Sequence, residues 1–151
     1  MAGKVDYEKI LSEKGVVAFV PSGNSMWPTL KGGKQSVVVK AKEKRLSYYD
    51  VALYVRADGV NVLHRVVEVK DDGYVMRGDS QDLLETVKEE QVIGVMAGFY
   101  RGQRYIDAND ARYLNQVERW FRKKLLRKIR LKLFYTKQRI KNKIKKGKIS
   151  K

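Results

Sequence analysis

Residues 60–77 read Val60-Asn-Val-Leu-His-Arg-Val-Val-Glu-Val-Lys-Asp-Asp-Gly-Tyr-Val-Met-Arg77. Valine and other β-branched or aromatic residues dominate this stretch, and Asp-Asp-Gly interrupts it. Branched and aromatic side chains favour strands, whereas Asp and Gly favour turns. The stretch therefore predicts two neighbouring strands, at 60–69 and 73–77, joined by a short turn.

Segments of the same kind occur on both sides of this pair. They predict further strands at 16–20, 36–40, 51–56 and 91–100, and a short helix at about 6–13. A spacing of about ten residues between strands favours an antiparallel, barrel-like sheet over alternating strands and helices. We therefore expect a mainly β fold, with an antiparallel barrel-like core and a long basic C-terminal helix.

The charge divides the chain into two parts. The net charge is +16, and residues 101–151 hold 19 Lys and Arg against 3 Asp and Glu. Residues 1–100 hold 14 of each kind and are neutral. We expect a β domain at 1–107 and, at 108–151, a basic amphipathic helix whose Lys-rich end is frayed beyond Gly147.

The helix is predicted from apolar residues that recur every three or four positions. These residues are Leu114, Val117, Phe121, Leu125, Ile129 and Leu133. Asn109 or Asp110 would cap a helix that runs to about Ile144. Such a basic helix is typical of membrane-surface binding, and nucleic-acid binding or packing against a partner are the alternatives. The predicted contact residues are Trp120, Phe121, Arg122, Lys123, Arg127 and Arg130.

Several classes of protein are excluded or disfavoured by composition. The chain has no cysteine, which excludes disulfides, thiolate metal sites and a cysteine nucleophile. We expect no cofactor and no metal. The sequence has neither a signal-peptide pattern nor a run of about 18–20 apolar residues that could span a bilayer. A cytoplasmic protein, peripheral at the inner face of the membrane, is the expectation.

A candidate catalytic site begins in the loop Pro21-Ser-Gly-Asn-Ser-Met-Trp-Pro-Thr-Leu30, where two prolines flank Ser25. A serine needs a neighbouring base to become nucleophilic, and His64 is the only histidine. Asp79 or Asp82 would supply a carboxylate that orients the imidazole. The alternative is an ordinary hairpin loop with a solvent-facing serine and a structural histidine.

Three of these segments resemble the successive motifs of type I signal peptidases, in the LexA/signal peptidase superfamily. They are Ser25-Met-Trp-Pro-Thr-Leu30, His64-Arg-Val66 and Gly78-Asp79, and the histidine is similar to the Ser-His branch of that family. Bacterial signal peptidases and LexA-like repressors carry a lysine base instead. The layout also resembles small soluble members of the superfamily that have a basic C-terminal helix.

The resemblance implies a serine endopeptidase that cleaves a peptide or preprotein. Ser25 would attack the scissile carbonyl, and its backbone N–H would contribute to the oxyanion hole. His64 would be the base and Asp79 its orienting acid, with Asp82 as competitor, although Glu85 stands nearer the spacing of the family's second acid. Met26 and Pro28 would contact substrate. The alternatives are an inactive peptide-binding module of a secretion or maturation system and a basic nucleic-acid-binding protein.

Overall fold

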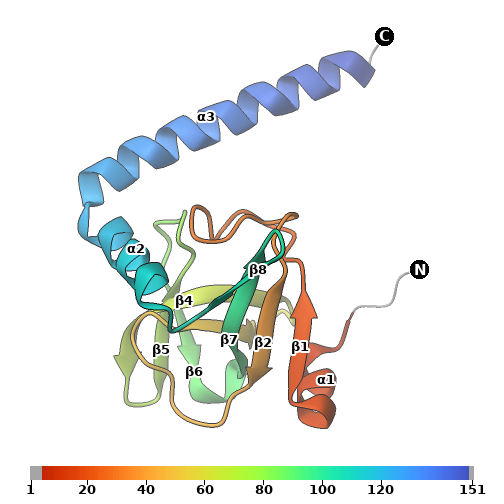
Figure 1. Ribbon diagram of the computed structural model, residues 1–151, viewed down its shortest axis with the longest axis vertical. Helices are drawn as coiled ribbons and strands as arrows, with labels where there is room; N and C mark the ends of the chain where they lie inside the picture. Colours follow the sequence, from red (N-terminus) through yellow and green to blue (C-terminus); the bar gives the residue numbers. More distant parts are fainter. Residues whose placement is uncertain (1–4, 150–151) are drawn as a thin grey trace. The chain divides into compact units, whose positions relative to one another are not determined.

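The computed structural model describes residues 5–149, with the side chains of 124, 125, 127 and 145–149 left aside. Its elements in chain order are α1 (Tyr7–Lys14), β1 (Val16–Phe19), β2 (Val37–Ala41), β3 (Val51–Val55), β4 (Asn61–Lys70), β5 (Gly73–Arg77), β6 (Glu85–Lys88), a 3₁₀ turn η1 (Glu89–Gln91), β7 (Val92–Arg101), β8 (Arg104–Asp107), α2 (Ala111–Arg122) and α3 (Lys124–Ile149). The fold is mainly antiparallel β with helices, as the sequence predicts (Figure 1).

The eight strands form one antiparallel sheet. Its order is β1-β2-β7-β3-β4-β5-β6, and β8 pairs with β7 beside this path. The predicted strands at 16–20, 36–40, 51–56, 60–69, 73–77 and 91–100 all occur, with ends that differ by one residue at most. The sequence analysis missed β6 and β8, which have only four residues each and are rich in charged residues.

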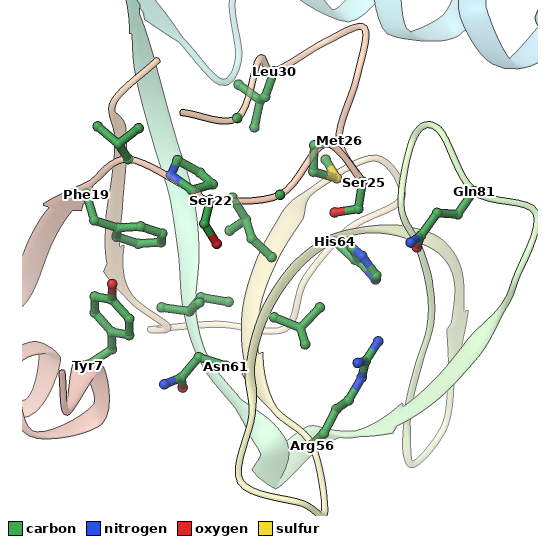
Figure 2. A pocket seen from close by; sticks show the side chains of 17 residues that line it. Tyr7, Phe19, Ser22, Ser25, Met26, Leu30, Arg56, Asn61, His64 and Gln81 are labelled. Carbon is green, nitrogen blue, oxygen red and sulfur yellow. The ribbon is translucent and has the colours of Figure 1, made fainter. Parts of the chain in front are cut away.

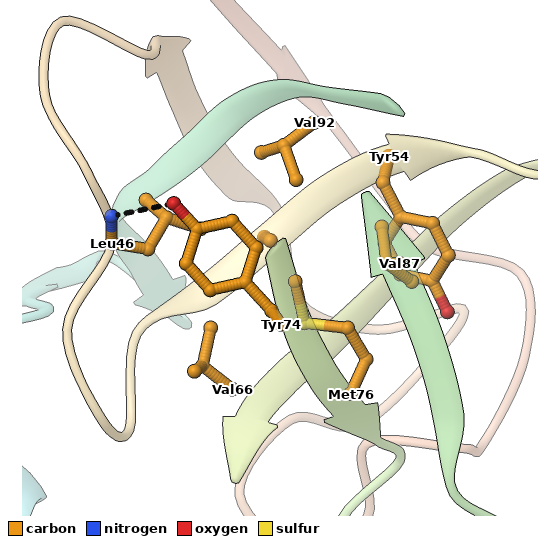
Figure 3. Packing of buried hydrophobic residues seen from close by; sticks show 8 residues of the cluster. Leu46, Tyr54, Val66, Tyr74, Met76, Val87 and Val92 are labelled. Atoms are coloured by element: carbon orange, nitrogen blue, oxygen red, sulfur yellow. Dashed lines mark hydrogen bonds between the residues drawn. The ribbon is translucent and has the colours of Figure 1, made fainter. Parts of the chain in front are cut away.

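One face of the sheet builds a hydrophobic cluster (Figure 3). Its buried members are Leu46, Ala52, Tyr54, Val66, Tyr74, Met76, Val87 and Val92. The strand register explains why they meet, because Val66 lies opposite Met76, and paired residues of antiparallel strands share a face. The Tyr74 hydroxyl accepts a hydrogen bond of 3.1 Å from the Leu46 backbone N–H, which satisfies its polar end.

The opposite face of β4 holds a buried ion pair between Arg65 and Asp79. Arg65 Nε and Nη2 donate to Asp79 Oδ1 and Oδ2 at 2.8 and 2.7 Å, and neither side chain is exposed. Arg65 also donates to the carbonyl of Tyr49 at 2.8 Å and to the hydroxyl of Tyr113 at 3.0 Å. A buried charge pair of this kind is stable only when its remaining donors are satisfied, and these bonds satisfy them.

The chain divides into two compact units, residues 1–114 and 115–151. The sequence analysis had placed the boundary between 107 and 108. Asp110 begins the first C-terminal helix, since its side chain accepts a hydrogen bond of 2.9 Å from Tyr113 N, as the predicted cap requires.

The prediction of one continuous helix was wrong, because α2 and α3 are separate and Lys123 lies between them. Neither proline nor glycine stands at this break, and nothing in the described residues explains it. Among the described residues α3 continues to Ile149, and the fraying of the Lys-rich end stays a prediction.

Candidate active site

Ser25 and His64 line the same pocket, which has a volume of about 540 Å³ (Figure 2). Ser25 belongs to the loop after β1, and His64 lies in the middle of β4. Figure 2 shows Ser25 and His64 in the wall of this pocket, which Gln81 also lines. The structure thus brings together two residues that are 39 positions apart in the sequence.

The loop that carries Ser25 is fastened to the turn after β5. The Ser25 carbonyl accepts hydrogen bonds from Ser80 N at 2.8 Å and from Ser80 Oγ at 3.0 Å. Gly78 lies so close that an added Cβ would stand 2.8 Å from the same carbonyl. These contacts fix the position of Ser25 relative to β5, because the turn that contains Gly78 and Ser80 follows directly from that strand.

The loop is also folded tightly upon itself. Gly33 N donates to the Pro21 carbonyl at 2.7 Å, and a Cβ on Gly32 would clash with the carbonyl of Gly23. Leu30 N donates to the Met26 carbonyl at 2.9 Å, which closes a turn over residues 26–30 that contains the cis Trp27-Pro28 bond.

The two predicted substrate contacts, Met26 and Pro28, differ in their relation to the pocket. Met26 lines it together with Leu30. Pro28 lies two residues from each and is not among the lining residues. A contact of Met26 and Pro28 with a substrate stays a prediction.

His64 is buried, at 3% exposure, and its Nδ1 faces two groups that the sequence analysis did not pair with it. The Tyr54 hydroxyl lies 3.2 Å from Nδ1, and Glu85 Oε1 lies 3.5 Å from it. Tyr54 in turn donates to Glu85 Oε2 at 3.1 Å. Since Tyr54 has one proton and gives it to Glu85, its oxygen is the acceptor for an Nδ1–H of the imidazole. This tautomer leaves Nε2 as the basic nitrogen.

Arg56 completes this network. Its guanidinium binds both oxygens of Glu85, with Nε donating to Oε2 at 2.6 Å. The hydrogen bond from Arg56 lowers the pKa of Glu85, which therefore stays ionised at neutral pH. Burial, with the nearby Glu85 charge, raises the pKa of Tyr54, so its hydroxyl keeps its proton.

The pKa of His64 is lowered from its ordinary value of 6.5. Burial is the main cause, because it disfavours the charged imidazolium, while the Glu85 charge acts in the opposite direction. The imidazole is therefore neutral at pH 7, which is the form that accepts a proton.

The acid predicted to orient His64 has a different set of contacts. Asp79 binds Arg65 and the hydroxyl of Thr29, four residues after Ser25. Arg65 lies opposite Arg77, the last residue of β5, and the turn that follows brings Asp79 onto the Arg65 guanidinium. Asp82 is exposed. The carboxylate beside Nδ1 is instead that of Glu85.

Strand register contains the signal that would have identified Tyr54 and Glu85. His64 lies opposite Ala52, so Tyr54 is its diagonal neighbour on the same face. Val66 lies opposite Met76, and Met76 lies opposite Glu85, which brings Glu85 to that face as well.

The predicted contact residues of the C-terminal unit have different exposures. Arg122, Lys123 and Arg130 are exposed, and the side chain of Arg127 lies outside the described residues. Trp120 and Phe121 are only 6% and 8% exposed, and their predicted contact with a membrane or partner stays a prediction. Within residues 5–149, none of the helices is both long enough and apolar enough to cross a bilayer. Over the same range the structure contains no cluster of His, Cys, Asp and Glu able to hold a metal ion.

Comparison with known proteins gives no relative from which a role could be transferred. No protein-family model matches the chain, and no curated protein matches it significantly.

Proposed function

We propose that this protein is a serine endopeptidase, with Ser25 as nucleophile and His64 as general base. One observation carries the proposal: Tyr54 and Glu85 occupy Nδ1 of the only histidine, whose ring lines the same pocket as Ser25. Nε2 is then the nitrogen available to the Ser25 hydroxyl. A serine, a base and an oriented base are the three parts that nucleophilic catalysis by serine needs.

The chemistry follows from these positions. His64 Nε2 accepts the proton of Ser25 Oγ while Oγ forms a bond to the carbonyl carbon of the peptide. The imidazolium then returns this proton to the leaving nitrogen as the C–N bond breaks, and an acyl-enzyme remains. Water hydrolyses the acyl-enzyme by the same two proton transfers. Glu85 stabilises the transient imidazolium through its charge, and Tyr54 holds the ring orientation.

The oxyanion of the tetrahedral intermediate needs hydrogen-bond donors that are not already used. The backbone N–H of Ser25 is suited to this role, because it donates to no acceptor within the described part of the chain. The hydrogen bonds from Ser80 to the Ser25 carbonyl hold the backbone of Ser25 in place.

The pocket beside Ser25 favours a peptide with apolar or small side chains. Much of its wall is apolar and consists of Phe19, Val20, Met26, Leu30, Leu53, Val62 and Leu63. Pockets of this kind bind apolar groups by removing them from water. An apolar or small residue next to the cleaved bond is therefore the expected specificity.

The lining also supports a barrel-like core of the kind found in the signal peptidase superfamily. Phe19 of β1 and Val62 of β4 line one pocket, although two strands separate β1 from β3 and three separate it from β4. Neighbouring strands lie about 4.8 Å apart, so a flat sheet would hold these residues too far from each other. A curved sheet, together with the order of Ser25, His64 and Gly78-Asp79, agrees with the resemblance seen in the sequence.

Cleavage of a peptide library tests the proposal without knowledge of the substrate. The protein is incubated with a mixture of defined peptides, and new termini are identified by mass spectrometry. We expect cleavage by the wild type and by Ser22→Ala, whose serine lines the same pocket, and none by Ser25→Ala or His64→Ala. Cleavage that survives Ser25→Ala would overturn the proposal.

An inactive peptide-binding module is the second candidate. It is favoured by one observation: among the described residues, no hydrogen bond joins Ser25 Oγ to His64. Such bonds are often long before substrate binds, and for this reason we prefer the peptidase. Peptides that bind the wild type and Ser25→Ala equally, with no new termini, would support the module instead.

A further inference from the structure

An exposed apolar stripe runs along α3. It consists of Leu126, Ile129, Leu133, Ile140 and Ile144, each between 45% and 64% exposed. Each residue of an α-helix advances about 100° around the axis, so these five side chains lie within an arc of about 60°. Scattered exposed apolar residues are normal in proteins, but five on one narrow arc form a continuous surface.

Cations border this stripe on both sides. Lys137, Arg130 and Lys141 follow it along one edge, and Lys132 and Lys143 lie along the other, all of them exposed. The 26 residues of α3 include 12 Lys and Arg and no acid. The helix therefore has no internal ion pairs to neutralise its charge, and any partner must supply many negative charges together with an apolar phase.

We propose that α3 binds an anionic lipid bilayer, lying in the interface with the stripe of Leu126, Ile129, Leu133, Ile140 and Ile144 toward the acyl chains. A bilayer surface supplies both requirements, because its phosphates face the flanking cations and its hydrocarbon receives the stripe. A nucleic acid would satisfy the cations but offers no apolar surface along about 27 Å, the length from Leu126 to Ile144. The length and charge of α3 fit a helix that lies on a membrane.

The long side chains of the flanking cations strengthen this arrangement. Lys and Arg can extend their polar ends toward the headgroups while their methylene groups remain beside the apolar stripe. Arg130 and Lys132 lie on opposite sides of Leu133 around the helix axis, which suits this geometry. Exposed leucine and isoleucine residues, rather than the buried Trp120 and Phe121, are thus the groups that enter the bilayer.

Vesicle flotation of the full chain tests the inference with two variants of equal charge. The first, Leu133→Glu with Ile140→Glu, places two acids in the stripe. The second, Gln138→Glu with Asn142→Glu, adds the same charge on the opposite side of the helix. Vesicles of phosphatidylcholine with about 30 mol % phosphatidylglycerol are compared with phosphatidylcholine alone. Circular dichroism verifies that each variant is folded.

We expect the wild type to bind the anionic vesicles at least about tenfold more tightly than the neutral ones. The stripe variant should lose at least about tenfold in affinity for the anionic vesicles, and the matched variant should stay within about threefold of the wild type. Equal losses in the two variants would overturn the inference, because charge alone would then explain binding. Binding to RNA or DNA at the same salt, with no binding to vesicles, would overturn it as well. None of these measurements depends on peptidase activity, so the inference and the proposed function fail separately.

Discussion

The carboxylate of Glu85 lies 3.5 Å from Nδ1 of His64, and the Tyr54 hydroxyl bridges the same two groups. Glu85 belongs to β6, a four-residue strand at one end of the sheet, and His64 to β4. In this position the glutamate can stabilise a positive imidazole and fix which nitrogen carries the proton. The groups around His64 and the buried pair of Arg65 and Asp79 can each be tested by substitution.

Replacing Glu85 by Gln should lower the pKa of His64 further. Glu85 is the main group that opposes the effect of burial, and without it the positive charge of Arg56 is no longer balanced. Because the chain has one histidine, an NMR titration of the ring gives this pKa without ambiguity. The rate of Ser25 acylation should fall at least about tenfold, which corresponds to about 1.4 kcal/mol of lost stabilisation.

Glu90→Gln is the control, since Glu90 is exposed and pairs with Lys88. Glu90→Gln should change neither the pKa of His64 nor the rate of Ser25 acylation. An unchanged His64 pKa in Glu85→Gln would contradict the position we assign to the carboxylate.

Replacing Tyr54 by Phe should weaken the tautomer preference of His64. The ring of Tyr54 packs in the hydrophobic cluster and is preserved, while the hydroxyl between Nδ1 and Glu85 is lost. Ring ¹⁵N chemical shifts report the tautomer directly and should move toward a mixture of both forms. The free energy of unfolding should fall by about 0.5–1.5 kcal/mol, as is typical for one hydrogen bond. Unchanged ¹⁵N shifts would mean that Tyr54 does not orient the imidazole.

Asp79→Asn should destabilise the protein strongly. The substitution leaves the guanidinium of Arg65 buried without its counter-charge, which costs about 3–5 kcal/mol when one partner of a buried pair is removed. Urea unfolding measures this loss. Asp71→Asn, at an exposed position, should change the free energy of unfolding by no more than about 0.5 kcal/mol.

The same variants separate a structural from an orienting role for Asp79. Where Asp79→Asn remains folded, it should lower the pKa of His64 less than Glu85→Gln does, because the Asp79 charge is the weaker of the two influences. The reverse order would restore Asp79 as the acid that acts on His64.

Stability should depend on pH through His64. Burial lowers its pKa in the folded protein, so the unfolded chain binds the proton more tightly. The contribution of neutral His64 to the free energy of unfolding is complete above a pH of about 6.5 and is lost as pH falls through the pKa of the folded protein. The loss is about 1.4 kcal/mol for each unit by which the pKa of His64 is lower in the folded than in the unfolded chain. Urea unfolding between pH 8 and pH 5.5 or thereabouts should show a smaller decline in His64→Gln than in the wild type. Parallel curves would contradict a lowered pKa.

The sequence was sufficient to predict the strands rich in valine and aromatic residues but not the acid beside His64. Val51–Val55 and Gly73–Arg77 are rich in residues that favour strands, and their pattern alone predicts them. Glu85–Lys88 reads Glu-Thr-Val-Lys, which is too short and too polar to predict a strand, and only pairing with β5 makes it one.

Register is the physical information that local patterns lack. The side chains at 64 and 65 point to opposite faces of β4, so a residue that meets one cannot readily meet the other. Asp79 was predicted because it follows Gly78, but the turn after β5 pairs it with Arg65. Ser25 and His64 could be predicted because each is distinctive by itself: one lies in a loop flanked by two prolines, and the other is the single histidine.

Covalent labelling with a fluorophosphonate reporter, followed by mass spectrometry of the labelled peptide, tests most directly whether His64 activates Ser25. The account predicts an adduct on Ser25 in the wild type, with Ser22 of the same pocket unlabelled. His64→Ala should slow the labelling of Ser25 by about 10²-fold or more, because general-base catalysis is lost. Labelling of Ser25 at the same rate in His64→Ala, or an adduct on another serine alone, would contradict it.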